Sequence, residues 1–212
     1  MLRLGCVLAA MLLVAVHTHA AETVALFDGK TFAGWNGDTE HTWRIESGMI
    51  VAGSPETPAP RNEFLATDVE YDDFVLRLEY RVDCTKSCNA GIQFRSQRVP
   101  NHHEMVGYQA DIAPGITGAI YDESRRNKLL VVPPKDTQQR AIALAKNGWN
   151  EYVIRCEGPR IRLAINGVEM ADYTEADQTI PQRGRIGLQI HGGFIGQIRY
   201  RAIRIEPLGD PP

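Results

Sequence analysis

The sequence predicts an all-β protein built as a sandwich or jelly roll. Alternation with period two recurs along the chain, and no segment of helical length keeps a 3.6-residue period. Turn-forming glycines separate the alternating segments, as in proteins made of many short strands. The clearest strand covers residues 74–82, where the apolar even positions alternate with Arg77, Glu79 and Arg81. This pattern is typical of a strand with one buried face.

The same period predicts further strands at 149–156, 161–165, 168–173, 185–191 and 197–205. Asn166-Gly167 supplies the two residues that a type I′ hairpin turn needs at positive φ. Two long segments show no strand pattern: the proline-rich 54–62 and the segment 124–147, in which we expect a short helical turn at 141–145. Long loops on a rigid sheet often carry function.

The N-terminus has the pattern of a secretory signal peptide. Arg3 precedes an uncharged, mainly apolar run at 4–16, which is too short to span a membrane, and Thr18-His19-Ala20 suits cleavage before Ala21. Cys6 lies at the start of the apolar run rather than after it, so its position argues against a lipoprotein. We therefore expect a signal peptide at 1–20, one domain at 21–212, and export to the periplasm or the cell exterior.

Charge and hydropathy narrow the range of partners. The formal net charge is −3 and both signs are mixed along the chain, so no basic field for nucleic acid is present. No second apolar run is long enough to span a membrane. The expected partner is a neutral or small molecule, and the sequence carries no signal for a particular oligomeric state.

Three cysteines follow the predicted cleavage point. Cys84 and Cys88 are four residues apart in a polar stretch, and an exported protein can form disulfides. A zinc site is the alternative, but no second cysteine pair or suitably spaced histidine accompanies them. We expect a Cys84–Cys88 disulfide, and we expect Cys156 to be a buried thiol because it lies within an apolar alternation.

Three predicted strands carry unusual polar faces. Their polar positions hold glycines, amides and single charged groups: Gly91, Gln93 and Arg95; Gln109 and Asp111; Gly187, Gln189 and His191. An ordinary solvent face is one interpretation, since sandwich exteriors are polar. Planar hydrogen-bonding groups favour a ligand surface instead, and the glycines would let a ligand approach the backbone.

Two other segments are rich in polar side chains. Residues 117–128 combine Tyr121, Glu123 and Arg125 and are either a solvated loop or part of a sugar site. His102-His103-Glu104 is a further candidate. In a strand the two histidines would point to opposite faces, so at most one could join a given site.

A set of ordered motifs resembles the 3-keto-disaccharide hydrolase domain family, of the concanavalin A-like lectin and glucanase superfamily. The motifs span nearly the whole mature chain and are LFDGK (26–30), GW (34–35), WRI (43–45), GMI (48–50), NAGIQFRS (89–96), GYQAD (107–111), GAIY (118–121), WNEY (149–152) and GRIGLQIHGG (184–193). The resemblance implies a concanavalin-like jelly-roll β-sandwich. It also implies an enzyme that cleaves glycosides whose sugar is oxidised at C3.

The implied substrate suggests a chemical route. A ketone at C3 acidifies the C2 proton, so a base can remove it, the C1 substituent can leave, and water can add to the double bond. This route needs a base, a donor for the enolate oxygen and an acid. It does not need the paired carboxylates at fixed separation that ordinary glycosidases use. The alternative function is a non-catalytic, lectin-like module, because the jelly roll also occurs in lectins.

We assign roles on this basis. His191 is expected to be the base or acid, Arg95 the donor to the enolate, Asp111 a carboxylate partner, and Glu123 a further catalytic group at the rim. Substrate contacts are expected from Gln93, Gln109, Gln189, Tyr108, Tyr121 and Arg125. No cofactor is required by this scheme, although a divalent metal held by Asp111, Glu123 and His191 could replace Arg95.

Overall fold

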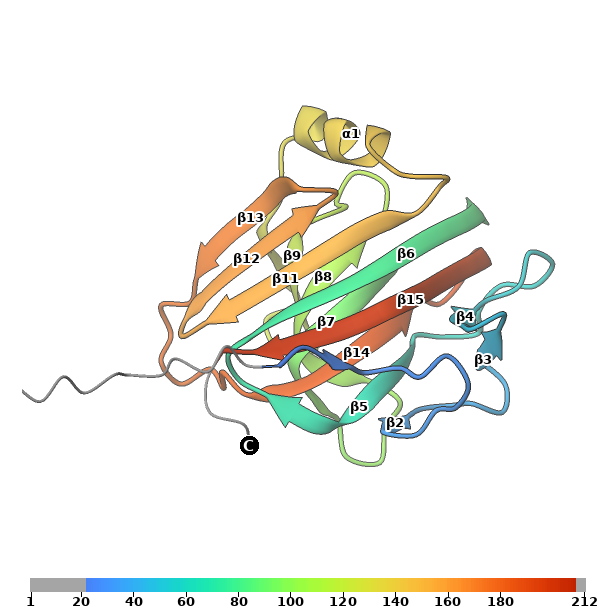
Figure 1. The fold of residues 1–212 in the computed structure, drawn as a ribbon, viewed down its shortest axis with the longest axis horizontal. Helices are drawn as coiled ribbons and strands as arrows, with labels where there is room; N and C mark the ends of the chain where they lie inside the picture. The colour runs from blue at the N-terminus through green and yellow to red at the C-terminus, as the bar shows by residue number, and fades with distance from the viewer. Residues whose placement is uncertain (1–21, 209–212) are drawn as a thin grey trace, which may run out of the picture.

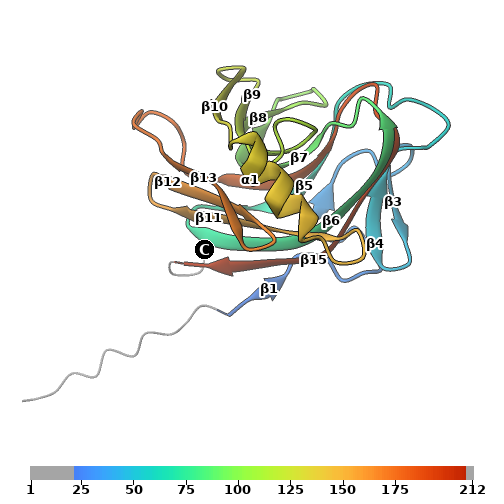
Figure 2. The ribbon, with the colours of Figure 1, turned by 90° about the horizontal axis from the view of Figure 1, so that it is seen from above.

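Two antiparallel sheets are stacked face to face in the computed structural model, which describes residues 22–208 (Figure 1). Seen from above, the sheets form two layers, and the helix α1 lies across one end of them (Figure 2). The all-β jelly-roll prediction is therefore confirmed. The predicted signal peptide, with Cys6, lies outside the described residues.

Sheet A forms one layer. In spatial order its strands are β13 (Val168–Thr174), β12 (Arg160–Ile165), β11 (Asn150–Glu157), β6 (Phe74–Lys86), β15 (Ile195–Pro207), β4 (Met49–Ala52) and β3 (Trp43–Glu46), with β1 (Val24–Ala25) also paired to β15. Sheet B forms the other layer. Its order is β10 (Lys128–Val131), β9 (Ile120–Glu123), β8 (Met105–Ile112), β7 (Ala90–Arg98), β14 (Gly184–Ile190), β5 (Glu63–Tyr71) and β2 (Trp35–Asn36).

Alternation decides which side chains enter the core between the sheets. In β6 the even positions Leu76 and Leu78 are buried, and in β8 Tyr108, Ala110 and Ile112 join the same apolar cluster. The odd-numbered residues of β8 therefore point to the outer face of sheet B, away from sheet A. Asn166 and Gly167 have φ of 52° and 79°, as the predicted hairpin turn between β12 and β13 requires.

The long segment 124–147 is more regular than predicted. It contains β10 and the helix α1 (Lys135–Ala143), which begins directly after Pro134 and ends within the expected turn at 141–145. Proline is well suited to a helix start because its nitrogen has no hydrogen to donate.

The cysteines are placed as expected. Cys84 and Cys88 form a disulfide with a Cα–Cα distance of 5.6 Å, and Cys156 is a buried free thiol. Among the helices of residues 22–208, none is long and apolar enough to cross a membrane.

Candidate functional site

A polar cavity of about 270 Å³ opens on the outer face of sheet B, at the end where β7 begins and β8 and β14 end. We call it the site cavity. Its walls are formed by Asn62, Asn89, Gln109, Asp111, Ile116, Tyr121, Glu123, Leu129 and His191. The volume is close to the lower limit of small-molecule pockets, about 300 Å³, and suits one or two sugar rings better than a long chain.

Strand pairing brings the predicted polar positions together. Gly91 is paired with Asp111 on one side and with Gln189 on the other, and Gln93 is paired with Gln109. Gln93, Gln109, Asp111 and Gln189 consequently share one face of sheet B. Gln93 and Gln189 are fully buried and lie outside the cavity wall.

A chain of buried hydrogen bonds leads to the Asp111 carboxylate. Ser96 Oγ donates to Gln93 Oε1 at 2.7 Å, Gln93 Nε2 donates to Gln109 Oε1 at 2.8 Å, and Gln109 Nε2 donates to Asp111 Oδ1 at 2.7 Å. The other oxygen, Asp111 Oδ2, is buried and has no hydrogen-bond partner within residues 22–208. The chain therefore orients the carboxyl group and leaves one oxygen free.

Asp111 and Glu123 have strongly perturbed acidities. Burial raises the pKa of Asp111 to about 7, the hydrogen bond from Gln109 opposes this shift, and the charge of Glu123 adds to it. Burial also raises the pKa of Glu123 to about 7, with the charge of Glu104 acting in the same direction and His191 against it. Both carboxyl groups are therefore partly protonated near neutral pH.

His191 follows β14 directly and has a defined tautomer. Its Nδ1 lies 2.9 Å from the carbonyl oxygen of Gly192. A carbonyl oxygen can only accept, so Nδ1 carries the hydrogen and Nε2 of the neutral ring keeps a lone pair. This nitrogen is able to accept a proton from a ligand in the site cavity.

Arg95 does not lie with these residues, and its predicted place in the site is wrong. A bulge interrupts β7 between Phe94 and Gln97, and Arg95 has a φ of 48°. The buried guanidinium instead donates to Asp72 O at 2.8 Å, Gly158 O at 2.7 Å and Asp73 Oδ1 at 2.8 Å. Arg95 thus joins sheet B to loops of sheet A and cannot reach a ligand in the site cavity.

Tyr108 and Arg125 are also separate from the site cavity, so their expected substrate contacts are wrong. Tyr108 faces the core, opposite to Gln109, and its hydroxyl donates to Glu175 Oε2 at 2.7 Å. Arg125 lies 4.6 Å over the Tyr108 ring and donates from Nε to Asp122 Oδ1 at 2.8 Å. Tyr108 and Arg125 thus belong to a structural cluster that includes the carboxylates of Asp122 and Glu175. Tyr121 and Glu123, which alternate with Asp122, do line the site cavity.

The glycines of the polar face serve packing rather than ligand approach. A Cβ atom at Gly91 would lie 2.8 Å from the Gln109 side chain, and one at Gly187 would lie 2.8 Å from Met105 Sδ. Side chains of the protein fill the space that we expected a ligand to use. Because Gly91 and Gly187 have no side chain, neighbouring side chains such as Gln109 and Met105 can pack against the sheet there.

The sequence reasoning missed four residues of the wall: Asn62, Asn89, Ile116 and Leu129. Asn89 precedes Gly91 by two positions, so extending the alternation of β7 would have identified it. Asn62 ends the proline-rich segment, whose path the sequence pattern does not predict. Within residues 22–208, no three His, Cys, Asp or Glu side chains form a group that could hold a metal ion.

A family model described as the 3-keto-alpha-glucoside-1,2-lyase-like domain matches residues 22–206. The chain belongs to this family. The match covers every residue of the site cavity, and it confirms the resemblance drawn from the motifs. Membership in the 3-keto-alpha-glucoside-1,2-lyase-like family makes the chain a glycosyl hydrolase-like, carbohydrate-active protein.

Solved structures share the fold at low sequence identity. A proposed glycosyl hydrolase from Parabacteroides distasonis has a TM-score of 0.62 at 17% identity, over 88% of this chain and 94% of that one. The carbohydrate binding module CBM66 from Bacillus subtilis has a TM-score of 0.58 at 13% identity, over 82% and 95%. The Bacillus licheniformis beta-glucanase has a TM-score of 0.53 at 10% identity, over 91% and 100%. A comparison with curated proteins returns no match.

Proposed function

We propose that the chain cleaves 3-keto-glycosides, 3-keto-disaccharides included, by elimination followed by hydration. The single observation that carries this proposal is the free Nε2 of His191 beside the Asp111 and Glu123 carboxyl groups in one small cavity. A base next to carboxyl groups that are partly protonated near pH 7 supplies two of the three groups that the route needs, the base and the acid.

The steps follow from these positions. His191 Nε2 removes the C2 proton, which the C3 ketone has acidified, and the electron pair moves to the C3 oxygen. The C1–O bond then breaks, a C1=C2 double bond forms, and a carboxyl group of the Asp111–Glu123 pair protonates the leaving oxygen. Water finally adds its hydroxyl to C1 and its hydrogen to C2. Net hydrolysis results without a change in oxidation state.

Because Arg95 does not lie in the site cavity, uncharged groups must donate the hydrogen bonds that stabilise the enolate oxygen. Tyr121 and Asn89 line the site cavity, and both carry a hydrogen-bond donor. Donors that are already in place where negative charge develops lower the barrier without reorganisation. We assign the binding of the C3 oxygen to these two side chains.

The expected location is the periplasm or the cell exterior, as the N-terminal pattern suggests. The disulfide between Cys84 and Cys88 supports an oxidising compartment. Mass analysis of the secreted protein tests this, because export predicts a mature chain that begins at Ala21.

The decisive test of the function compares a 3-keto-glucoside with its unoxidised parent. We expect the purified protein to release the aglycone from the oxidised sugar alone. Saturable binding of either sugar without release would instead favour the lectin-like module, which the shared fold of the carbohydrate binding module also allows.

A further inference from the structure

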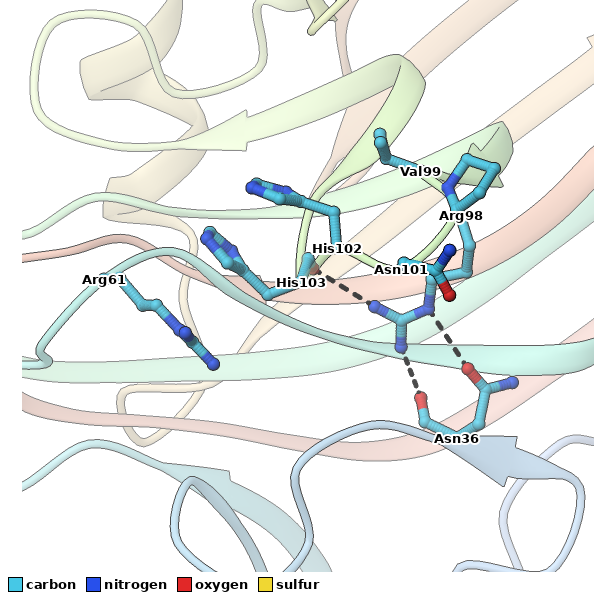
Figure 3. A pocket seen from close by; sticks show the side chains of 8 residues that line it. Asn36, Arg61, Arg98, Val99, Asn101, His102 and His103 are labelled. Atoms are coloured by element: carbon cyan, nitrogen blue, oxygen red, sulfur yellow. Dashed lines mark hydrogen bonds between the residues drawn. The ribbon is translucent and has the colours of Figure 1, made fainter.

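A second, basic cavity lies next to the site cavity. Its open volume is about 760 Å³, and it is lined by Asn36, Arg61, Arg98, Val99, Pro100, Asn101, His102 and His103 (Figure 3). We call it the basic cavity. Every titratable side chain in its wall is a base, whereas the site cavity is lined by the acids Asp111 and Glu123.

Only a short wall of protein separates the two cavities. Asn62 lines the site cavity, and its neighbour Arg61 lines the basic cavity. Asn62 Nδ2 donates to Glu104 Oε1 at 3.3 Å, and Glu104 follows His103 in the chain. One ligand with two units could therefore occupy both cavities across the Asn62–Glu104 contact.

The wall of the basic cavity is held in place by Arg98. This side chain donates from Nε to Asn36 Oδ1 at 3.1 Å, from Nη2 to Asn36 O at 2.6 Å and from Nη1 to His103 O at 3.4 Å (Figure 3). Nη2 also donates to Phe64 O at 2.9 Å. These bonds tie the turn between β7 and β8 to β2 and β5. The cavity is thus formed before a ligand arrives.

The two histidines act together, contrary to the expectation that they point apart. Residues 99–104 form a turn rather than a strand, so alternation does not apply. The His102 and His103 rings stack with centroids 4.3 Å apart, and both line the basic cavity. His103 Nδ1 is buried, makes no hydrogen bond in the described part of the chain, and lies 3.7 Å from Glu104 Oε1.

Arg61 supplies a positive charge that is only partly neutralised by an ion pair. Its Nε is paired with Glu63 at 2.7 Å, and its side chain is 57% exposed. Within residues 22–208 its two terminal nitrogens make no hydrogen bond to protein, so they remain available to a ligand. Glu63 and Glu104 offset part of the charge, but neither lines the cavity.

We propose that the basic cavity binds an anionic second unit of the substrate, a uronate or another carboxylate-bearing group joined to the sugar in the site cavity. This inference rests on the proposed function for the identity of the first unit. Arginine binds a carboxylate through two parallel hydrogen bonds, and a neighbouring imidazole can donate a third. Such a contact would select acidic glycosides over neutral ones.

The test measures binding without turnover. Calorimetry compares a disaccharide that contains glucuronate with its neutral glucose counterpart, both unoxidised, at low and high salt. We expect the acidic disaccharide to bind about tenfold more tightly at low salt, because charge-assisted hydrogen bonds are strong and screening weakens them. Arg61→Gln should remove this preference and leave the affinity for the neutral sugar unchanged.

Arg204→Gln is the matched control, because Arg204 is exposed on sheet A and far from both cavities in the topology. It removes the same charge and should keep the preference. Equal affinities for the two sugars, no binding of either, or a preference that survives Arg61→Gln would overturn the proposal. Failure of the proposed function would appear separately, as absent turnover of 3-keto-glycosides by a protein that still prefers the acidic sugar.

Discussion

Gln109 donates a hydrogen bond of 2.7 Å to Oδ1 of Asp111, whose second oxygen is buried and has no hydrogen-bond partner among residues 22–208. A carboxylate held in this way is costly to ionise. Burial raises its pKa to about 7, whereas the unfolded chain ionises near the ordinary value of 3.8. The group therefore lowers the stability of the fold as the pH rises from about 4 to about 7, and the full cost is present above that range.

Asp111→Asn should consequently stabilise the protein. We expect a gain of about 2 kcal/mol in the free energy of unfolding at pH 8, and little gain at pH 3, where the aspartic acid is largely protonated in both states. Denaturant unfolding at the two pH values measures the difference. A gain that is the same at both values would show that ionisation of Asp111 is not its cause.

Arg95→Met should reduce stability rather than function. The guanidinium joins two backbone carbonyls and Asp73, and its removal leaves buried acceptors without partners. We expect a loss of about 3 kcal/mol in the free energy of unfolding, and unchanged kcat/KM per folded molecule at low temperature. Arg204→Met serves as the control for a surface arginine. If a fully folded Arg95→Met protein lost turnover, Arg95 would have a role in catalysis and this prediction would be wrong.

His191→Ala should reduce catalytic activity and leave stability largely unchanged. Its side chain contacts the neighbouring Gly192 carbonyl and lines the site cavity, so the fold depends on it little. We expect kcat on a 3-keto-glycoside to fall by about 10²–10⁴-fold, the usual worth of a positioned base. His41→Ala, at an exposed position near β3, is the control and should keep full activity. A similar kcat in both variants would exclude His191 as the base.

Glu123→Gln tests whether the carboxyl groups of the site cavity provide the acid. A carboxyl group must stay protonated to act as the acid, so we expect the rate of the wild type to fall as the pH rises above about 7. Glu123→Gln removes one partner of the pair and should lower kcat and change this alkaline limb. Initial rates across the pH range measure both effects. If the pH–rate profile of Glu123→Gln had the same alkaline limb as that of the wild type, Glu123 would not contribute to the group that acts as the acid.

Much of the site could be predicted because period two is strict within regular strands. Gln93, Gln109, Asp111 and Gln189 share a face for this reason, and the register between β7, β8 and β14 places them side by side. The same rule excludes Tyr108, which alternates with Gln109 and faces the core.

Other features depend on geometry that alternation does not describe. The bulge at Arg95 shifts the phase of β7, and Gly184 accommodates it, since a Cβ there would lie 2.4 Å from the carbonyl carbon of Arg95. The turn at 99–104 brings both histidines to one cavity. Asn62 reaches the site from a long loop whose path is set by tertiary contacts, such as the bond from Gly192 N to Asn62 Oδ1 at 3.0 Å.

Hydrogen exchange at C2 distinguishes the proposed elimination from direct displacement. The reaction of a 3-keto-glycoside is run in heavy water, with matched incubations that contain no protein or the His191→Ala variant to measure exchange of the free ketone. We expect deuterium at C2 of the sugar released by the wild-type protein, above the level of both controls, because hydration returns a solvent hydrogen to that carbon. Released sugar that keeps its original hydrogen at C2 would contradict elimination and indicate direct displacement at C1.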